Sequence, residues 1–148
     1  MTTSIKIVLA DDDADDRFLF ESALREVNKE TQLITADCAD DLLLILDKQE
    51  VLPDLIMLDI NMPGKNGLDC LQELRRSERF SSTPIAMFST SIEDAFLQLA
   101  SKKGADYFIK KPSSYSTLKK VVQFCLNIDG RRKENQQSFI IDIKSNQL

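Results

Sequence analysis

The 148-residue chain contains no histidine at all. This absence excludes Ser-His-Asp and Cys-His catalysis, histidine-ligated metal sites, and any phosphohistidine formed on the chain itself. Chemistry on this chain would therefore have to use carboxylates, hydroxyls and lysines. A bound metal would be a hard cation held by oxygen atoms.

Cysteine is scarce, with three residues, Cys38, Cys70 and Cys125, that lie far apart and form no CxxC pair. Buried, reduced thiols of a cytoplasmic protein are the simplest interpretation. No apolar run approaches the length of a membrane span, and the opening MTTSIKIVLADDD turns acidic too soon for a signal peptide. We therefore expect a cytoplasmic protein with no membrane contact.

The chain also lacks a large basic cluster, since its formal charge is −5 and its pI is near 4.8. DNA binding by this chain alone is therefore disfavoured. The apolar fraction of 43% and the charged fraction of 29% are typical of a globular protein. The length fits one domain with a proper core.

Short apolar runs alternate with segments of helical periodicity along most of the chain. The expected strands are Ile5–Ala10, Gln32–Ala36, Leu55–Leu58, Ile85–Phe88 and Asp106–Lys110. The expected helices run from Asp13 to Val27, from Asp40 to Lys48, from Leu68 to about Arg79, from a cap at Thr90 or Ser91 to Gly104, and after Pro112 through Leu118 and Cys125. Five strand–helix units with short connections predict an α/β domain whose parallel sheet has helices on both faces.

Polar side chains follow four of these strands, at the points where the strands end. They are Asp11, Asp12 and Asp13, then Asp59 and Asn61, then Ser89 and Thr90, and finally Lys110, Lys111 and Pro112. Each has a local explanation, because acidic residues begin helices, hydroxyls cap them and turn-formers follow strands. In open α/β sheets, however, sites form outside the carboxyl ends of the strands. The combination therefore predicts a site of carboxylates, a hydroxyl and an ammonium.

Carboxylates gathered in a partly buried crevice repel one another, and a divalent cation would offset that repulsion. Oxygen ligands suit Mg²⁺, which typically takes a few protein oxygens together with a phosphate oxygen. A carboxylate beside the metal could then attack a phosphoryl group, with lysine and metal neutralising the developing charge.

Four motifs in their order make the chain resemble the receiver domain of two-component response regulators, the CheY-like family. They are VLADDDADD, LIMLDINMPGKNGLD, MFSTS and GADYFIKKP, and they span roughly residues 4–127. The resemblance implies a (βα)5 flavodoxin-like, doubly wound parallel sheet with strand order 2-1-3-4-5. It implies a stand-alone response regulator rather than an enzyme, which accepts a phosphoryl group from a sensor histidine kinase or phosphotransfer protein and then binds a downstream protein target.

The resemblance implies that Asp59 is the phosphoacceptor. It makes Asp12 a direct Mg²⁺ ligand, Asp11 a ligand mainly through water, and Asn61 a ligand through its backbone carbonyl. Asp13, Asp15 and Asp16 are expected to serve the N-terminus of the following helix.

Ser89 matches the family's switch hydroxyl, with Thr90 as the alternative. The family's lysine directly precedes a proline, which selects Lys111 and implies a cis bond to Pro112. Phe108 takes the place of the switch aromatic, whereas Tyr107 is expected to point to the other face of the sheet. Phosphorylation would draw Ser89 toward the phosphoryl group and leave space for Phe108. Pro63 and Gly67 fit the loop after the phosphoacceptor, and both also suit a simple turn.

Two other functions are considered. The chain could be an unphosphorylated scaffold that keeps only the fold, or a Mg²⁺-dependent phosphatase with an aspartyl nucleophile, although DINMP lacks the DxD-type pattern of such enzymes. Residues 128–148 form a tail in which Phe139–Ile143 looks strand-like. That segment is expected to extend a sheet or to support a homodimer.

Overall fold

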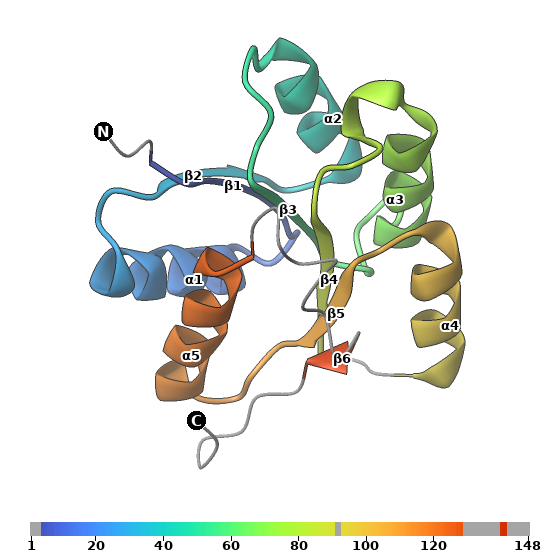
Figure 1. Cartoon of the computed structure of the whole chain (residues 1–148). Helices are drawn as coiled ribbons and strands as arrows, with labels where there is room; N and C mark the ends of the chain where they lie inside the picture. Colours follow the sequence, from blue (N-terminus) through green and yellow to red (C-terminus); the bar gives the residue numbers. More distant parts are fainter. Residues whose placement is uncertain (1–3, 91–92, 129–139, 142–148) are drawn as a thin grey trace.

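The computed structural model describes residues 4–90, 93–128 and 140–141, and these form alternating strands and helices (Figure 1). The strands are β1 (Lys6–Ala10), β2 (Gln32–Ala36), β3 (Leu55–Leu58), β4 (Ile85–Ser89), β5 (Tyr107–Lys110) and β6 (Ile140–Ile141). The helices are α1 (Ala14–Val27), α2 (Ala39–Lys48), α3 (Gly67–Arg76), α4 (Asp94–Lys103) and α5 (Tyr115–Leu126), with a 3₁₀ turn, η1 (Glu78–Phe80). None of these helices has the length and apolar character that a membrane span requires.

All the strands pair in parallel, in the order β2-β1-β3-β4-β5-β6. The predicted flavodoxin-like order of the first five strands is therefore confirmed, and β6 adds a sixth strand at the β5 edge. Strand order reverses between β1 and β3, because the chain moves outward to β2 before it crosses back. A crevice at such a reversal is where open α/β sheets bind ligands.

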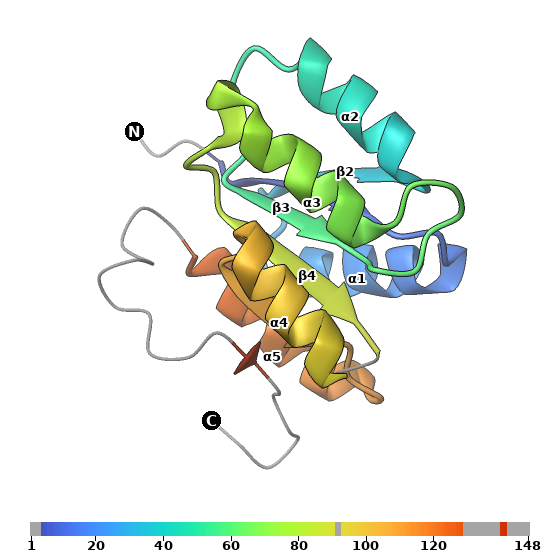
Figure 2. The same ribbon diagram turned by 90° about the vertical axis from the view of Figure 1, so that its right-hand side faces the viewer.

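Helices cover both faces of the sheet, as predicted. Figure 2 shows α2, α3 and α4 as one layer, while α1 and α5 lie behind the sheet. Two separate apolar clusters fill the spaces between the layers. One joins Leu42, Leu71 and Phe108 on the side of α2, α3 and α4, and the other joins Phe20, Val121 and Tyr107 on the side of α1 and α5.

The central strands are continuous apolar runs because both of their faces are buried. Every residue of β3, with the sequence LIML, is at most 1% exposed. Strands of this kind have no solvent face, so their ends are the only places where they can present polar groups. Asp59 directly follows this strand, and Asp11 follows β1 in the same way.

Some helix boundaries differ from the predicted ones. Helix α3 ends at Arg76 rather than near Arg79, since the chain turns at Ser77 and forms η1, which buries Phe80 in the core. Helix α4 begins only at Asp94, with Glu93 in the cap position. The predicted cap at Thr90 is therefore wrong, and Ser91 lies outside the described residues.

The tail contributes Ile140 and Ile141 to the sheet. They pair with Phe108 and Ile109 of β5, so this part of the tail extends the sheet of its own chain. Ile141 packs against the apolar cluster of α1 and α5, whereas the Ile140 side chain is 43% exposed. The rest of the expected strand, Phe139 and residues 142–143, lies outside the described residues.

Candidate functional site

Two neighbouring strands bring Asp11 and Asp59 together. Ala10 of β1 is paired with Leu58 of β3, and each aspartate is the next residue along its strand. The backbone N–H of Asp59 donates to the carbonyl oxygen of Ala10 at 3.0 Å, so the pairing continues to the phosphoacceptor candidate. The placement of both carboxylates therefore follows from the register of the two buried strands.

Carboxylate oxygens of Asp11, Asp12 and Asp59 lie within 4.8 Å of one another. Asp11 is 1% exposed and Asp59 is 6% exposed, while Asp12 reaches solvent. Two buried carboxylates and one exposed one, all hard oxygen donors, suit Mg²⁺ with several waters left on the ion. The donor set thus fits the predicted cofactor, and Asp11, Asp12 and Asp59 are the side chains that could hold it.

The carboxyl group of Asp11 has a pKa that departs from its ordinary value. Burial raises the pKa of Asp11 to about 6, although its bonds to Lys111 and to the backbone N–H of Asp13 act in the opposite direction. The nearby charge of Asp59 adds to the rise. Ionisation of Asp11 therefore lowers the free energy of unfolding at neutral pH when no cation is present.

This cost gives a pH-dependent prediction for the metal-free protein. Because the pKa of Asp11 in the folded protein lies above its ordinary value of 3.8, the cost is greatest above pH 6 and diminishes as the pH falls. We expect Asp11→Asn to stabilise the chelator-treated protein by about 2–3 kcal/mol near pH 7.5 and by roughly 1 kcal/mol less near pH 5. Urea unfolding at both pH values measures this difference in the free energy of unfolding. Asp12→Asn, which alters an exposed carboxylate, is the control, and an equal gain from both variants would contradict the assignment.

Lys111 lies one residue beyond β5 and brings its ammonium among the carboxylates. Its Nζ is 2.7 Å from Asp11, 2.9 Å from Asp16 and 3.2 Å from Asp59. The side chain is 9% exposed and lies against the ring of Phe88, 5.6 Å from its centroid. Burial opposes the charged form, but the bonds to the aspartates outweigh it and raise the pKa of Lys111 above its ordinary value. Of the two adjacent lysines, the structure therefore places the predicted one in the site.

Asp16 is a member of this cluster that sequence reasoning missed. It was expected to serve only the N-terminus of α1, a role that Asp13 fills as the N-cap by accepting from the backbone N–H groups of Asp15 and Asp16. One signal in the sequence could have revealed it. Asp16 stands four residues before Phe20, which is fully buried, and residues four apart share one face of a helix. Asp16 therefore faces the sheet, at the edge where the strands end.

The hydroxyl candidates differ in burial. Ser89 is the last residue of β4 and is fully buried, whereas Thr90 is exposed. The carbonyl oxygen of Ser89 accepts from the backbone N–H of Lys111 at 2.8 Å. Ser89 is thus held beside the residue that carries the site's ammonium, which favours it over Thr90 as the switch residue. Its role stays a prediction.

Phe108 and Tyr107 point to opposite faces of β5, as expected. Phe108 belongs to the cluster of α2, α3 and α4, and Tyr107 packs on Phe124 of α5 with ring centroids 5.3 Å apart. Phe108 is already fully buried in this structure. Phosphorylation was expected to let Phe108 move inward, but its ring is already inside the core in this structure, so no such movement is available to it.

The remaining predicted positions lie in the loops at the same edge. Asn61 is exposed, directly beyond Ile60, and its proposed role as a carbonyl ligand stays a prediction. Gly67 begins α3 and donates its N–H to the carbonyl oxygen of Ile60 at 2.9 Å. The predicted cis bond before Pro112 is wrong, because the described backbone has no cis peptide. The ammonium of Lys111 reaches Asp59 with the trans bond, which X–Pro sequences intrinsically prefer, so the site does not require the other isomer.

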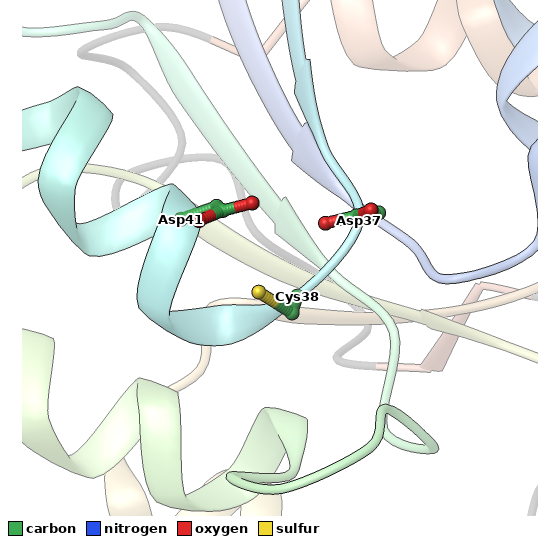
Figure 3. Close-up of side chains that lie close together, drawn as sticks. All are labelled: Asp37, Cys38 and Asp41. Atoms are coloured by element: carbon green, nitrogen blue, oxygen red, sulfur yellow. The ribbon is translucent and has the colours of Figure 1, made fainter.

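A second group that could hold a cation lies where β2 passes into α2. Figure 3 shows Asp37, Cys38 and Asp41 there, with the two carboxylates turned toward each other. Both aspartates are exposed, and acidic side chains at a helix N-terminus are stabilised by the helix dipole without any ligand. We assign no site to this group.

Comparisons with known proteins agree with this geometry. The DNA-binding response regulator MtrA of Mycobacterium tuberculosis is 32% identical over 107 residues, which is 72% of this chain and 44% of that protein. The chemotaxis response regulator CheY4 of Vibrio cholerae matches with a TM-score of 0.71 and 26% identity, over 82% of this chain and 98% of that one. The phosphorylated cyanobacterial phytochrome response regulator RcpA, at 23% identity and a TM-score of 0.77, covers 92% of this chain and 98% of its own, and shows the shared fold.

The chain spans less than half the length of the first curated relatives that it matches. The family model for the response regulator receiver domain matches residues 7–123, which include Asp11, Asp59 and Lys111. Receiver domains are signalling domains that bind Mg²⁺ in an acidic pocket, in agreement with the carboxylates gathered after β1 and β3. On this match, and on its parallel sheet, the chain belongs to the response regulator receiver domain family.

Proposed function

We propose that this chain accepts a phosphoryl group on Asp59, with Mg²⁺, from the phosphohistidine of a sensor histidine kinase or a phosphotransfer protein. One observation carries the proposal. The buried carboxylate of Asp59 meets oxygens of Asp11 and Asp12 within 4.8 Å and the ammonium of Lys111 at 3.2 Å. A nucleophile, a cation-binding pair and a positive charge thus converge at the end of β3.

The residues divide the chemistry among them. A carboxylate oxygen of Asp59 forms the new bond to phosphorus while the bond from phosphorus to the donor's imidazole nitrogen breaks. Mg²⁺ would neutralise charge on the phosphoryl oxygens when it is bound. Lys111 supplies a second positive charge, and the surrounding apolar strands keep most water away from Asp59. This arrangement lowers the electrostatic cost of bringing a phosphoryl anion to a carboxylate.

The surface beside the site suits a protein phosphodonor. Leu19 of α1 is 41% exposed, although it is a large apolar residue. It shares a small cavity of about 40 Å³ with the lysine of the site, and the lining residues are Asp16, Leu19, Phe88, Lys111, Pro112 and Leu118. Exposed apolar side chains next to a reactive group favour a protein partner.

The proposed output is a change in the face formed by α4, β5 and α5. Ser89 at the end of β4 would turn toward the phosphoryl group, and the neighbouring β5 would adjust with it, because Ser89 pairs with Lys110. Since Phe108 is already buried, the proposed movement is a shift of β5 and α4 rather than an inward swing of this ring. A downstream protein would then bind the two forms with different affinities.

A protein target is favoured over DNA. The net charge is −5, which opposes binding to a polyanion. A cytoplasmic location is proposed from the three free cysteines, two of them buried. The tail strand on β5 favours an intramolecular role for the tail, and homodimerisation through this edge would have to displace it.

A beryllofluoride titration tests the proposal against the scaffold alternative. We expect ¹⁹F NMR to show a bound, protein-specific fluoride signal only when Mg²⁺ is present, because the adduct needs both the Asp59 oxygen and the cation. Asp59→Asn should lose the signal, and Asp69→Asn, on the exposed first turn of α3, should keep it. A wild-type chain that forms no adduct at saturating Mg²⁺ would contradict the proposed phosphorylation and support the unphosphorylated scaffold.

A further inference from the structure

Lys111 has more carboxylate partners than its proposed task requires. An ammonium group carries three N–H donors, and three different aspartates lie around Nζ, at 2.7 Å, 2.9 Å and 3.2 Å. Two of them, Asp11 and Asp59, are the residues that would hold Mg²⁺ and the phosphoryl group. Asp16 is the third, and it is outside the set of carboxylates close enough together to hold a cation.

We propose that Asp16 is a positioning residue that keeps the ammonium of Lys111 in the site while Asp11 and Asp59 change partners. This inference rests on the proposed function and adds a residue to it. Asp11 and Asp59 are also among the side chains that would hold Mg²⁺, so the cation would compete with the lysine for their oxygens. Lys111 would then lose two of its three acceptors, and the carboxylate of Asp16 would remain.

The backbone of Asp16 is fixed in a position from which its carboxylate reaches the lysine. Its N–H donates to the Asp13 carboxylate at 3.2 Å, which fixes the first turn of α1. One turn later Phe20 is fully buried and packs edge-on against Phe88, with ring centroids 5.9 Å apart. The Asp16 side chain is 34% exposed, so its charge is hydrated in part and costs little to keep. Asp16 therefore belongs to a rigid helix end rather than to a loop that moves with the ligand.

Competition for Lys111 determines the expected effect on metal binding. Without Asp16, the ammonium would be shared only between the two carboxylates that Mg²⁺ needs, and the cation would have to displace a more firmly held lysine. With Asp16 present, the lysine keeps a partner after displacement. Asp16 should therefore raise the affinity for Mg²⁺, although it is not a ligand of the ion.

Calorimetric Mg²⁺ titration of Asp16→Asn provides the test, and Asp15→Asn is the matched control. Both variants remove one negative charge from the first turn of α1, but Asp15 is exposed and contributes no side chain to the lysine cluster. We expect Asp16→Asn to weaken Mg²⁺ binding by about three- to tenfold and Asp15→Asn by less than about twofold. Asp16→Glu, which keeps the carboxylate, should recover part of the loss.

The same pair of variants in a Lys111→Met background isolates the role of the lysine. If Asp16 acts through Lys111, Asp16→Asn should have no larger effect there than Asp15→Asn has. ¹⁵N NMR of the Lys111 ammonium gives a second readout, with faster proton exchange expected in Asp16→Asn because a hydrogen-bond acceptor is lost.

Three results would overturn the assignment: equal losses from the two single variants, an unchanged or higher affinity in Asp16→Asn, or an Asp16 effect that persists without the lysine. Wild-type protein that binds no Mg²⁺ would instead contradict the proposed function itself. Failure of the inference and failure of the function are therefore distinguishable in one series of titrations.

Discussion

Asp59→Asn is expected to abolish phosphorylation of the chain by acetyl phosphate and Mg²⁺, down to the background seen with no protein. The amide keeps the shape of the carboxylate but has no anionic oxygen to form the bond to phosphorus. Asp59 is 6% exposed at the end of a fully buried strand, and the neighbouring carboxylates of Asp11 and Asp12 are proposed as holders of the cation rather than as acceptors. Phosphate-affinity electrophoresis and intact-mass measurement, with loss of the label in hydroxylamine, follow the acyl phosphate.

The control for this experiment is Asp69→Asn, which changes an exposed aspartate in the first turn of α3 and should be labelled like the wild type. The fold should tolerate Asp59→Asn, because the Asp59 backbone N–H still donates to Ala10. Label incorporated at the wild-type rate would show that the acceptor is a different residue.

Gly67→Ala is expected to destabilise the protein by about 3 kcal/mol, close to the upper range for overpacking. A Cβ at this position would lie 2.1 Å from the backbone oxygen of Asp59 and 2.9 Å from Cα of Ile60. Both atoms belong to the backbone that leaves β3, so no side chain can rotate away to make room. The added methyl group would have to push α3 from the sheet or move Asp59, the proposed phosphoacceptor.

Gly64→Ala separates steric overlap from backbone strain. Gly64 has a positive φ of 76°, yet a Cβ there would meet nothing within 4 Å. Its substitution should cost about 1 kcal/mol through strain alone. Urea unfolding of both variants measures the difference, and weaker Mg²⁺ binding in Gly67→Ala should accompany the loss of stability. Equal costs for the two glycines would mean that the close approach at Gly67 is not decisive.

The sequence predicts the strands and the carboxylates at their ends from local patterns, whereas the order of the strands follows from the family resemblance. A strand such as LIML is apolar throughout, so its burial and its single polar end can be read directly from the sequence. Parallel strands end at the same edge of the sheet. Because Ala10 of β1 pairs with Leu58 of β3, the residues that follow them, Asp11 and Asp59, lie side by side. No knowledge of side-chain packing is needed for that conclusion.

Other features depend on contacts between distant residues, and these could not be predicted from local rules. Asp16 meets Lys111 across 95 positions of the chain, and its local setting suggested only a helix terminus. Helix α3 ends early and η1 buries Phe80 in the core, which periodicity alone does not reveal. The cis bond before Pro112 is implied only by the family resemblance, and β5 presents Lys111 to the site with the trans bond.

The order in which the elements follow one another along the chain has a consequence for folding. The elements up to α5, together with Ile128, supply every described member of both apolar clusters except Ile141, so the domain can close before the tail strand joins β5. Until Ile140 and Ile141 dock, the outer side of β5 offers its peptide groups to any nearby extended chain. The protein is therefore most prone to pair with a neighbouring chain in the interval between closure of the domain and docking of these two residues.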